Sequence, residues 1–204
     1  MTKEIKNRAK LIVVTGAMFS GKTRELIRRL ETAAHADEAL LVVKPTFDDR
    51  TKRSIWDMID DSNKLKDYPK LTKRVIESAE ELQSAVASIG PDIVVIDEAQ
   101  FLTDQSYVDC LTSLLEHNAE EDFEIIVAGL DMSWKREPFG IMPTLMCLAD
   151  EVIKFAAVCN ECKSKSALFT KKIAGSKRTK ETGDSDLYVA SCRVCFPKPY
   201  QAPE

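Results

Sequence analysis

The chain has 204 residues, of which 44% are hydrophobic and 30% are charged. This composition excludes a disordered or fibrous protein and supplies enough apolar material for a sizeable core. The net charge is −4, from 29 basic and 33 acidic residues, so no basic excess favours nucleic acid or an anionic membrane as a partner. No apolar run approaches the roughly 20 residues that cross a bilayer, and the polar N-terminus lacks the apolar stretch of a secretory signal. We therefore expect a cytoplasmic protein with one main domain and a small appendage.

The first part of the chain alternates short apolar runs with amphipathic patterns. Between the runs, apolar residues recur at three- and four-residue intervals and predict helices over 26–34, 75–89 and 107–115. Continuous apolar strands have no side that faces water, so they predict an open parallel α/β sheet that is covered on both faces. The runs that predict these strands are 11–14, 40–43, 93–96, 125–128 and 152–158.

Two segments depart from this alternation. Residues 47–71 are rich in Asp and Lys and predict a long loop. Residues 163–180 hold seven Lys or Arg and no acid, which predicts a solvated loop.

A phosphate-binding motif follows the first apolar run. Residues 16–23 (Gly-Ala-Met-Phe-Ser-Gly-Lys-Thr) match GxxxxGK[ST] without a mismatch, between a predicted strand and a predicted helix. The two glycines allow successive N–H groups to converge on phosphate oxygens, and the helix directs its positive dipole end at the same anion. The lysine would bind the β- and γ-phosphates, and the threonine would offer a hydroxyl to Mg²⁺. The sequence therefore predicts a nucleoside-triphosphate site formed by Gly16, Ala17, Met18, Phe19, Ser20, Gly21, Lys22 and Thr23.

Two carboxylates, Asp97 and Glu98, follow the apolar run at 93–96. Ligands gather at the carboxyl ends of parallel strands, so we expect both acids beside the phosphate loop. Neighbouring strand residues point to opposite sides, which favours one acid for Mg²⁺ and the other for proton transfer. In a kinase Glu98 would accept a proton from the acceptor hydroxyl, whereas in a motor it would polarise water. Asp48 and Arg50 could add an acid and a cation there, although by themselves they are typical of a loop surface.

Four of the six cysteines form two Cys-x-x-Cys pairs, Cys159/Cys162 and Cys192/Cys195. In a chain that we expect in the cytoplasm, this pattern predicts a metal site rather than disulfides. Four thiolates complete a tetrahedral Zn²⁺ shell and leave no position for water, so the ion would be structural. Two redox pairs are the alternative interpretation.

The two other cysteines and the two histidines are predicted to have no part in the chemistry. Cys110 and Cys147 lie on apolar helical faces and are expected in the core. His35 and His117 lie in polar surroundings and are expected at the surface.

Six motifs in order resemble the thymidine kinase family of the cellular, tetrameric type (type II), which is distinct from the herpesviral type. The resemblance runs from about residue 11 to residue 196, nearly the whole chain. The motifs are residues 16–23, 44–50, 97–101, 130–140, 157–162 and 188–195.

The resemblance implies transfer of the γ-phosphate of ATP to the 5′-hydroxyl of thymidine, which gives dTMP for DNA synthesis. It implies that Glu98 is the general base and that Lys22 and Arg50 stabilise the phosphoryl group, which revises the surface interpretation of the loop after residue 46. The Mg²⁺ region that it implies comprises Thr23, Asp48 and Asp97.

The same resemblance divides the chain into a phosphate-loop nucleotide-binding domain (1–155) and a zinc-binding lasso domain (156–204). The cysteines match the family's zinc ligands, and the loop between them matches a lasso that closes over the nucleoside. A homotetramer and feedback inhibition by dTTP are also implied. The positions that match the lining of the thymidine pocket are Met18, Phe101, Leu130, Trp134, Phe139, Gly183 and Tyr188.

Some positions depart from the family pattern. Trp134 replaces a smaller aromatic residue, and Glu181-Thr182 replaces an apolar pair before Gly183. A phosphate-loop ATPase or nucleic-acid adaptor with a zinc-anchored basic loop is the alternative function. The net charge of −4 and the lack of clustered aromatic residues in the basic loop count against it.

Overall fold

The computed structural model describes residues 9–46, 54–119, 121–175 and 185–196. Asp48, Arg50 and Gly183, which the sequence analysis assigned to the site, lie outside the described residues. In chain order the elements are β1 (Lys10–Gly16), α1 (Lys22–His35), β2 (Leu40–Pro45), α2 (Ile55–Asp61), β3 (Leu71–Ile76), α3 (Ala79–Ile89), β4 (Ile93–Ile96), the 3₁₀ helix η1 (Ala99–Phe101), α4 (Gln105–His117), β5 (Glu124–Gly129), α5 (Met142–Leu148), β6 (Glu151–Phe155), β7 (Ala167–Lys172) and β8 (Tyr188–Cys192).

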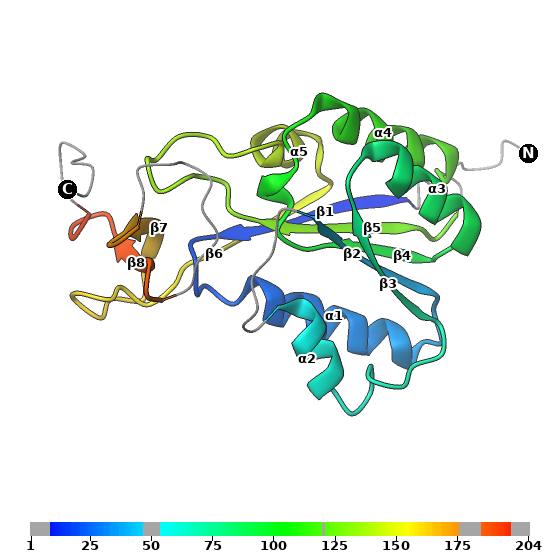
Figure 1. Ribbon diagram of the computed structural model, residues 1–204, viewed down its shortest axis with the longest axis horizontal. Coiled ribbons are helices and arrows are strands. Elements are labelled where there is room, and N and C mark those ends of the chain that lie inside the picture. Colours follow the sequence, from blue (N-terminus) through cyan, green and yellow to red (C-terminus); the bar gives the residue numbers. More distant parts are fainter. Residues whose placement is uncertain (1–8, 47–53, 120, 176–184, 197–204) are drawn as a thin grey trace, which may run out of the picture.

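Six strands form one sheet in the order β3-β2-β4-β5-β1-β6, and every neighbouring pair is parallel. Helices α1 and α2 cover one face of this sheet, and α3, α4 and α5 cover the other (Figure 1). The prediction of an open parallel α/β sheet with helices on both faces is therefore confirmed. None of the described helices is long and apolar enough to span a membrane.

Alternate residues of each central strand enter two separate cores. In β1, Leu11 and Val13 pack in the core beneath α3, α4 and α5, whereas Ile12 and Val14 pack in the core beneath α1 and α2. All four side chains are at most 3% exposed. Because both faces of the strand are buried, its sequence is an uninterrupted apolar run rather than an alternating one.

The boundary between the third strand and the third helix differs from the prediction. Val75 and Ile76 lie in β3, and α3 begins at Ala79. Ser78 caps this helix, because its side chain accepts a hydrogen bond from the backbone N–H of Glu81 at 3.2 Å. β3 is an edge strand, and most of its side chains are half-buried or exposed. Its apolar pattern is therefore weak, and its last two residues also fit the helical spacing of the segment that follows.

The predicted loop over 47–71 is wrong for residues 55–61, which form α2, whereas residues 62–70 lie outside helices and strands as predicted. Ser54 and Asp57 form a capping box at the start of α2. Ile55 and Ile59 are fully buried in the core beneath α1 and α2. The seven-residue helix fully buries one i,i+4 pair, partly buries Trp56 and Met58, and exposes its three Asp residues, so its charged residues outweigh its apolar signal.

A second, antiparallel sheet of β7 and β8 lies beyond the carboxyl end of β1 (Figure 1). The basic run therefore contains a strand, and the solvated-loop prediction is wrong for residues 167–172. Thr170 and Lys172 are each only 5% exposed. We call residues 157–173 and 185–196, which carry this sheet and both Cys-x-x-Cys pairs, the cysteine hairpin.

The predicted burial of the two other cysteines and the two histidines is confirmed in part. Cys110 packs partly buried against the core beneath α3 and α4, but Cys147 is exposed, so the prediction of a core position is wrong for Cys147. The short α5 presents Cys147 away from the sheet, because Met142 and Leu145 occupy its buried face. His35 and His117 are exposed, as predicted.

Leu111 of α4 is 1% exposed and packs against the sheet, so it tests whether this layer stabilises the fold. We expect Leu111→Ala to lower the free energy of unfolding by about 2–5 kcal/mol, because it removes buried methyl groups and leaves a cavity. Urea unfolding measures this change. The exposed Glu116 on the same helix provides the control, and Glu116→Ala should change the unfolding free energy by no more than about 0.5 kcal/mol. Equal effects of the two changes would contradict the assigned packing.

Candidate active site

The phosphate loop depends on glycine at both of its ends. Gly16 has φ +142°, and a Cβ there would lie 2.3 Å from the backbone oxygen of Phe155. Gly21 has φ +96° and caps the N-terminus of α1. A Cβ at Gly16 would clash with the backbone, and one at Gly21 would be strained by the positive φ, so this tight turn strongly favours glycine at both positions.

Lys22 and Ser20 have polar atoms inside the loop. The Nζ of Lys22 donates to the backbone oxygens of Gly16 and Ala17 at 3.2 and 3.1 Å, and the residue is 8% exposed. The Oγ of Ser20 is buried and has no hydrogen-bond partner among the described residues. A buried polar atom without a partner is costly, and a phosphate oxygen would satisfy it.

The loop meets the acidic end of β4 through Thr23. Its Oγ1 donates to Oδ2 of Asp97 at 3.4 Å. Asp97 is 2% exposed, and its other oxygen, Oδ1, accepts the backbone N–H of Glu98 at 3.0 Å. A hydroxyl and a carboxylate are therefore placed side by side next to the phosphate loop, and such oxygens are ligands that Mg²⁺ accepts.

Glu98 has different partners from Asp97, as its place after the strand predicts. Its backbone is left-handed, with φ 58° and ψ 35°, which is disfavoured for a residue with a Cβ. Oε2 of its carboxylate accepts a hydrogen bond from Nε2 of Gln100. The amide oxygen of Gln100 accepts the backbone N–H of Leu130 at 3.0 Å. One buried glutamine thus joins Glu98 to the end of β5.

Glycine also makes room for this glutamine. A Cβ at Gly129 would lie 2.7 Å from Oε1 of Gln100, and one at Gly140, where φ is +56°, would lie 2.3 Å from its backbone oxygen. In the sequence, Gln100 stands out only as part of the motif at residues 97–101. No local signal identifies its role, because its partners lie up to 30 residues away.

A second buried network joins the ends of β1, β5 and β6. The Oγ1 of Thr15 donates to the backbone oxygen of Gly129 at 3.0 Å and to Oδ1 of Asp131 at 3.2 Å. Asp131 also forms an ion pair with Lys154. These bonds fix the strand end that leads into the phosphate loop.

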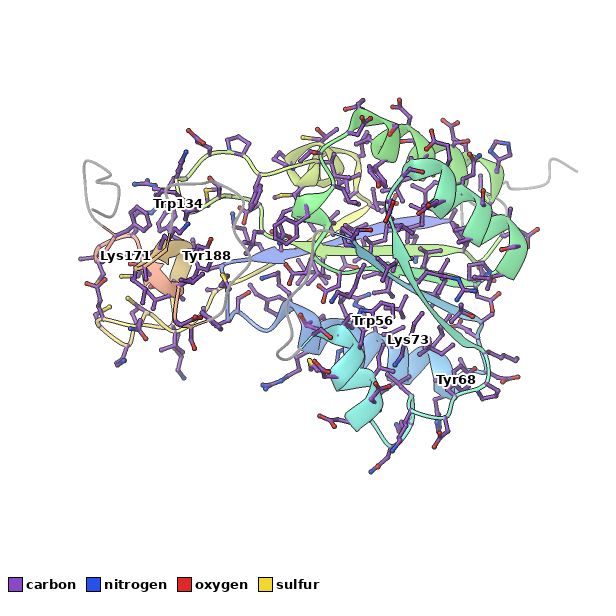
Figure 2. All side chains as sticks on the ribbon, viewed as in Figure 1. Trp56, Tyr68, Lys73, Trp134, Lys171 and Tyr188 are labelled. Carbon is purple, nitrogen blue, oxygen red and sulfur yellow. The ribbon has the colours of Figure 1, made fainter. Side chains whose placement is uncertain are left out.

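Four aromatic residues match the lining of the thymidine pocket, and they form two pairs in the structure. The rings of Phe101 and Phe139 meet edge to face, with centroids 6.0 Å apart. Trp134 and Tyr188, both labelled in Figure 2, share a partner: the Nζ of Lys172 lies 5.2 and 5.6 Å from their ring centroids.

The remaining two described residues of that set are held through their backbones. Leu130 is bonded to Gln100, and the N–H of Met18 donates to Oγ1 of Thr170 at 3.0 Å. Thr170 belongs to β7, so the cysteine hairpin touches the phosphate loop directly. Sequence reasoning missed Thr170 and Lys172 because both lie in a basic run that resembles ordinary surface.

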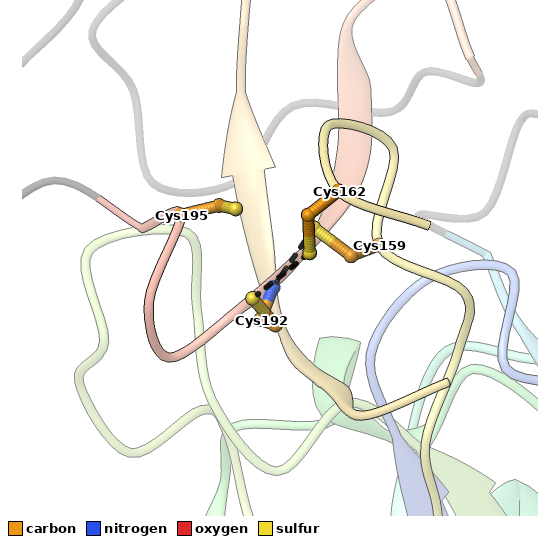
Figure 3. Close-up of side chains that lie close together, drawn as sticks. All are labelled: Cys159, Cys162, Cys192 and Cys195. Atoms are coloured by element: carbon orange, nitrogen blue, oxygen red, sulfur yellow. Dashed lines mark hydrogen bonds between the residues drawn. The ribbon is translucent and has the colours of Figure 1, made fainter. Parts of the chain in front are cut away.

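The four paired cysteines converge at one point (Figure 3). The Sγ atoms of Cys159, Cys162, Cys192 and Cys195 all lie within 4.8 Å of one another. The Cys162 and Cys192 sulfurs are 3.6 Å apart, well beyond the ~2.05 Å of a disulfide. A tetrahedron with Zn–S bonds of ~2.3 Å has sulfurs ~3.8 Å apart, so this cluster could hold a zinc ion.

The thiols have opposed pKa shifts, as crowded ligands without a cation should. Backbone N–H groups of Cys162 and Cys192 lower the pKa of Cys159, and the N–H of Cys195 lowers the pKa of Cys192. Hydrogen bonds with the Cys162 and Cys192 side chains raise the pKa of Cys195, because its protonated thiol is the donor in them. A divalent cation favours the thiolate at every position and removes this conflict.

The cysteine hairpin has a very small core of its own. Its buried cluster contains only alanines and cysteines: Ala157, Cys159, Ala167, Ala190 and Cys192, with Cys195 partly buried against them. Even with the buried rings of Phe169 and Phe196, which pack against each other, so small an apolar area cannot offset the entropy of ordering the chain. The hairpin therefore depends on its cysteine cluster and on its contacts with the rest of the molecule.

Comparisons with known proteins point to one family. A family model described as thymidine kinase matches residues 9–196. The chain is 36% identical to a thymidine kinase of Bacteroides fragilis over 200 residues, 98% of this chain and 92% of that protein. It is 36% identical to a thymidine kinase of Porphyromonas gingivalis over 97% of this chain and 89% of that protein. It is 33% identical to a thymidine kinase of Mesomycoplasma hyopneumoniae over 90% of this chain and 92% of that protein. The chain belongs to the thymidine kinase family.

Proposed function

We propose that this chain is an ATP-dependent thymidine kinase, which transfers the γ-phosphate of ATP to the 5′-hydroxyl of thymidine and yields dTMP. The observation that carries the proposal is the hydrogen bond of Thr23 to Asp97 beside Glu98. It places the phosphate-binding loop beside two carboxylates that have different partners. Asp97 is suited to bind a metal, and Glu98 is suited to accept a proton. Membership of the family supports thymidine as the acceptor.

The phosphate loop would bind ATP. Lys22 would exchange its bonds to the loop carbonyls for bonds to the β- and γ-phosphates, and Ser20 would gain a partner for its buried hydroxyl. Thr23 and Asp97 would hold Mg²⁺, which supplies neutralisation of the phosphate charge. Asp48 and Arg50 are carried over from the resemblance to the same region.

Glu98 would remove the proton from the 5′-hydroxyl. Gln100 binds one of its carboxylate oxygens, which fixes the orientation of the base. Proton transfer requires the base within hydrogen-bond reach of the hydroxyl, so a fixed carboxylate is more effective than a rotating one.

Aromatic side chains would hold the thymine base. An uncharged pyrimidine offers little to ion pairs, so ring packing and main-chain hydrogen bonds must supply the selectivity. The pair of Phe101 and Phe139, together with Trp134 and Tyr188, provides those rings. The remaining lasso contact, Gly183, stays a prediction from the resemblance.

The cysteine cluster would hold one structural Zn²⁺. The ion would supply the folding free energy that the alanine-rich core of the hairpin cannot, and it would stabilise residues 156–204 as a separate lasso domain. A homotetramer, inhibition by dTTP and a location in the cytoplasm stay predictions. Light scattering and a titration of dTTP into the kinase assay test the first two.

The test of the proposed function is a nucleoside panel with Mg-ATP. We expect phosphorylation of thymidine and, more weakly or equally, of deoxyuridine, but not of purine nucleosides. Phosphorylation of no nucleoside, or of purines alone, would refute the proposal. ATP turnover that DNA stimulates and thymidine does not would instead support the ATPase or adaptor alternative.

Glu98→Gln preserves the shape of the side chain and removes the base. We expect kcat to fall by about 100-fold or more, while the KM for ATP stays within about twofold, because the phosphate loop is unchanged. Steady-state kinetics measure both values, and Glu116→Gln on the exposed face of α4 is the matched control. Activity near that of the unmodified protein would show that another group accepts the proton.

Metal analysis tests the cysteine cluster. We expect about one equivalent of zinc per chain, and Cys195→Ser should remove most of it because a thiolate ligand is lost. Cys147→Ser provides the control, because Cys147 is exposed and lies outside the cluster. Protein without zinc that melts at the same temperature and retains full activity would refute a structural ion.

A further inference from the structure

The chain between β5 and α5 forms a turn whose tip is Arg136. We call residues 130–140 the pocket loop. The backbone N–H of Arg136 donates to the carbonyl of Ser133 at 2.9 Å, and the N–H of Ser133 donates to the carbonyl of Glu137 at 2.9 Å. These two bonds define a tight turn with Arg136 at its last position.

Arg136 has the backbone conformation that this position demands, φ +64°. Glycine adopts left-handed conformations freely, whereas a residue with a Cβ is strained in them. An arginine at such a position therefore needs a compensating contact, because strain of this kind persists only where the surroundings fix it.

The side chain of Arg136 makes that contact with the cysteine hairpin. Its guanidinium carbon lies 4.8 Å from the ring centroid of Phe169 in β7 and 5.2 Å from that of Phe196. The two rings pack against each other at 5.4 Å and are 5% and 2% exposed. Arg193 also lies over Phe169, at 5.3 Å, but it belongs to the hairpin itself and so does not link it to the pocket loop.

In a second contact, the hairpin supplies the cation and the pocket loop supplies the ring. Lys172 of the hairpin lies between the rings of Trp134, which belongs to the pocket loop, and Tyr188 of β8. Trp134 is 3% exposed and Tyr188 is 5% exposed. Each segment thus gives a cation to an aromatic ring of the other, and cations are attracted to ring faces most strongly where water is excluded.

We propose that Arg136 is a positioning residue: by stacking on Phe169 and Phe196, it docks the cysteine hairpin onto the pocket loop. The docking sets the relative placement of Trp134 and Tyr188. The alanine-rich core of the hairpin cannot fix this placement, and the cysteine cluster orders the hairpin without binding the pocket loop. The expected consequence for thymidine binding rests on the proposed function, whereas the docking itself does not.

Tryptophan fluorescence tests the docking without any substrate. The chain has two tryptophans, so Trp56→Phe leaves Trp134 as the only one. In this background we compare Arg136→Gly, which relieves the backbone strain, with Arg136→Lys, which keeps a cation. Lys171→Met is the control. Lys171 lies in β7, the strand that carries Phe169, but its side chain forms a surface ion pair with Glu161.

We expect Arg136→Gly to raise the acrylamide quenching constant of Trp134 at least twofold, with the zinc content unchanged. Arg136→Lys should give an intermediate value, and Lys171→Met should match the parent. Quenching in Arg136→Gly equal to that in Lys171→Met would overturn the proposal. Loss of zinc from Arg136→Gly would also overturn it, because the arginine would then stabilise the hairpin fold rather than position it.

Kinetics of the same substitutions in the otherwise unchanged protein test the consequence. We expect Arg136→Gly to raise the KM for thymidine about tenfold, while kcat and the KM for ATP change by less than twofold. Parallel losses in all three constants together with a lower melting temperature would indicate a general structural role and overturn the proposal. If the unmodified protein phosphorylates no thymidine, the proposed function fails, and the quenching experiment still decides the docking.

Discussion

The parallel register of β4, β5 and β1 is the constraint on which the rest of the site depends. These three strands are neighbours in the sheet, so their carboxyl ends lie side by side. The phosphate loop leaves β1, the two carboxylates follow β4, and the pocket loop leaves β5. Short hydrogen bonds can therefore join all three: Thr15 reaches the end of β5, Thr23 reaches Asp97, and Gln100 reaches Leu130. A sheet of another order would leave the same motifs without contact.

The cysteine hairpin depends on this sheet edge in a different way. Its apolar core is small, so its thiol cluster helps to order it internally and its outward contacts place it. Those contacts reach two of the three loops at the edge, because Thr170 binds the phosphate loop and Phe169 and Phe196 stack with Arg136.

Local patterns predicted much of this structure, and long-range contacts account for what they missed. The buried strands were predictable because both faces of the sheet are covered, and the phosphate loop and the cysteine pairs carry their chemistry within eight residues or fewer. The predictions failed for α2 and for the start of α3, because exposed residues dilute the apolar signal there. They failed for β7 because its buried residues include Thr170 and Lys172, which are of types usual at a surface. Gln100, Arg136 and Lys172 could not be found from spacing, because their partners are distant in the sequence.

Backbone strain marks the same positions. Among the described residues that are not glycine, positive φ occurs at Phe19, Asp37, Glu98, Arg136 and Lys163. Three of these five lie in the phosphate loop, after β4 and at the tip of the pocket loop. Glycine would remove the strain at Glu98 and Arg136, but it would also remove a carboxylate that Gln100 orients and a guanidinium that covers two rings. The strain is therefore best understood as the cost of placing a functional side chain on a turn, and it is offset by contacts from other elements.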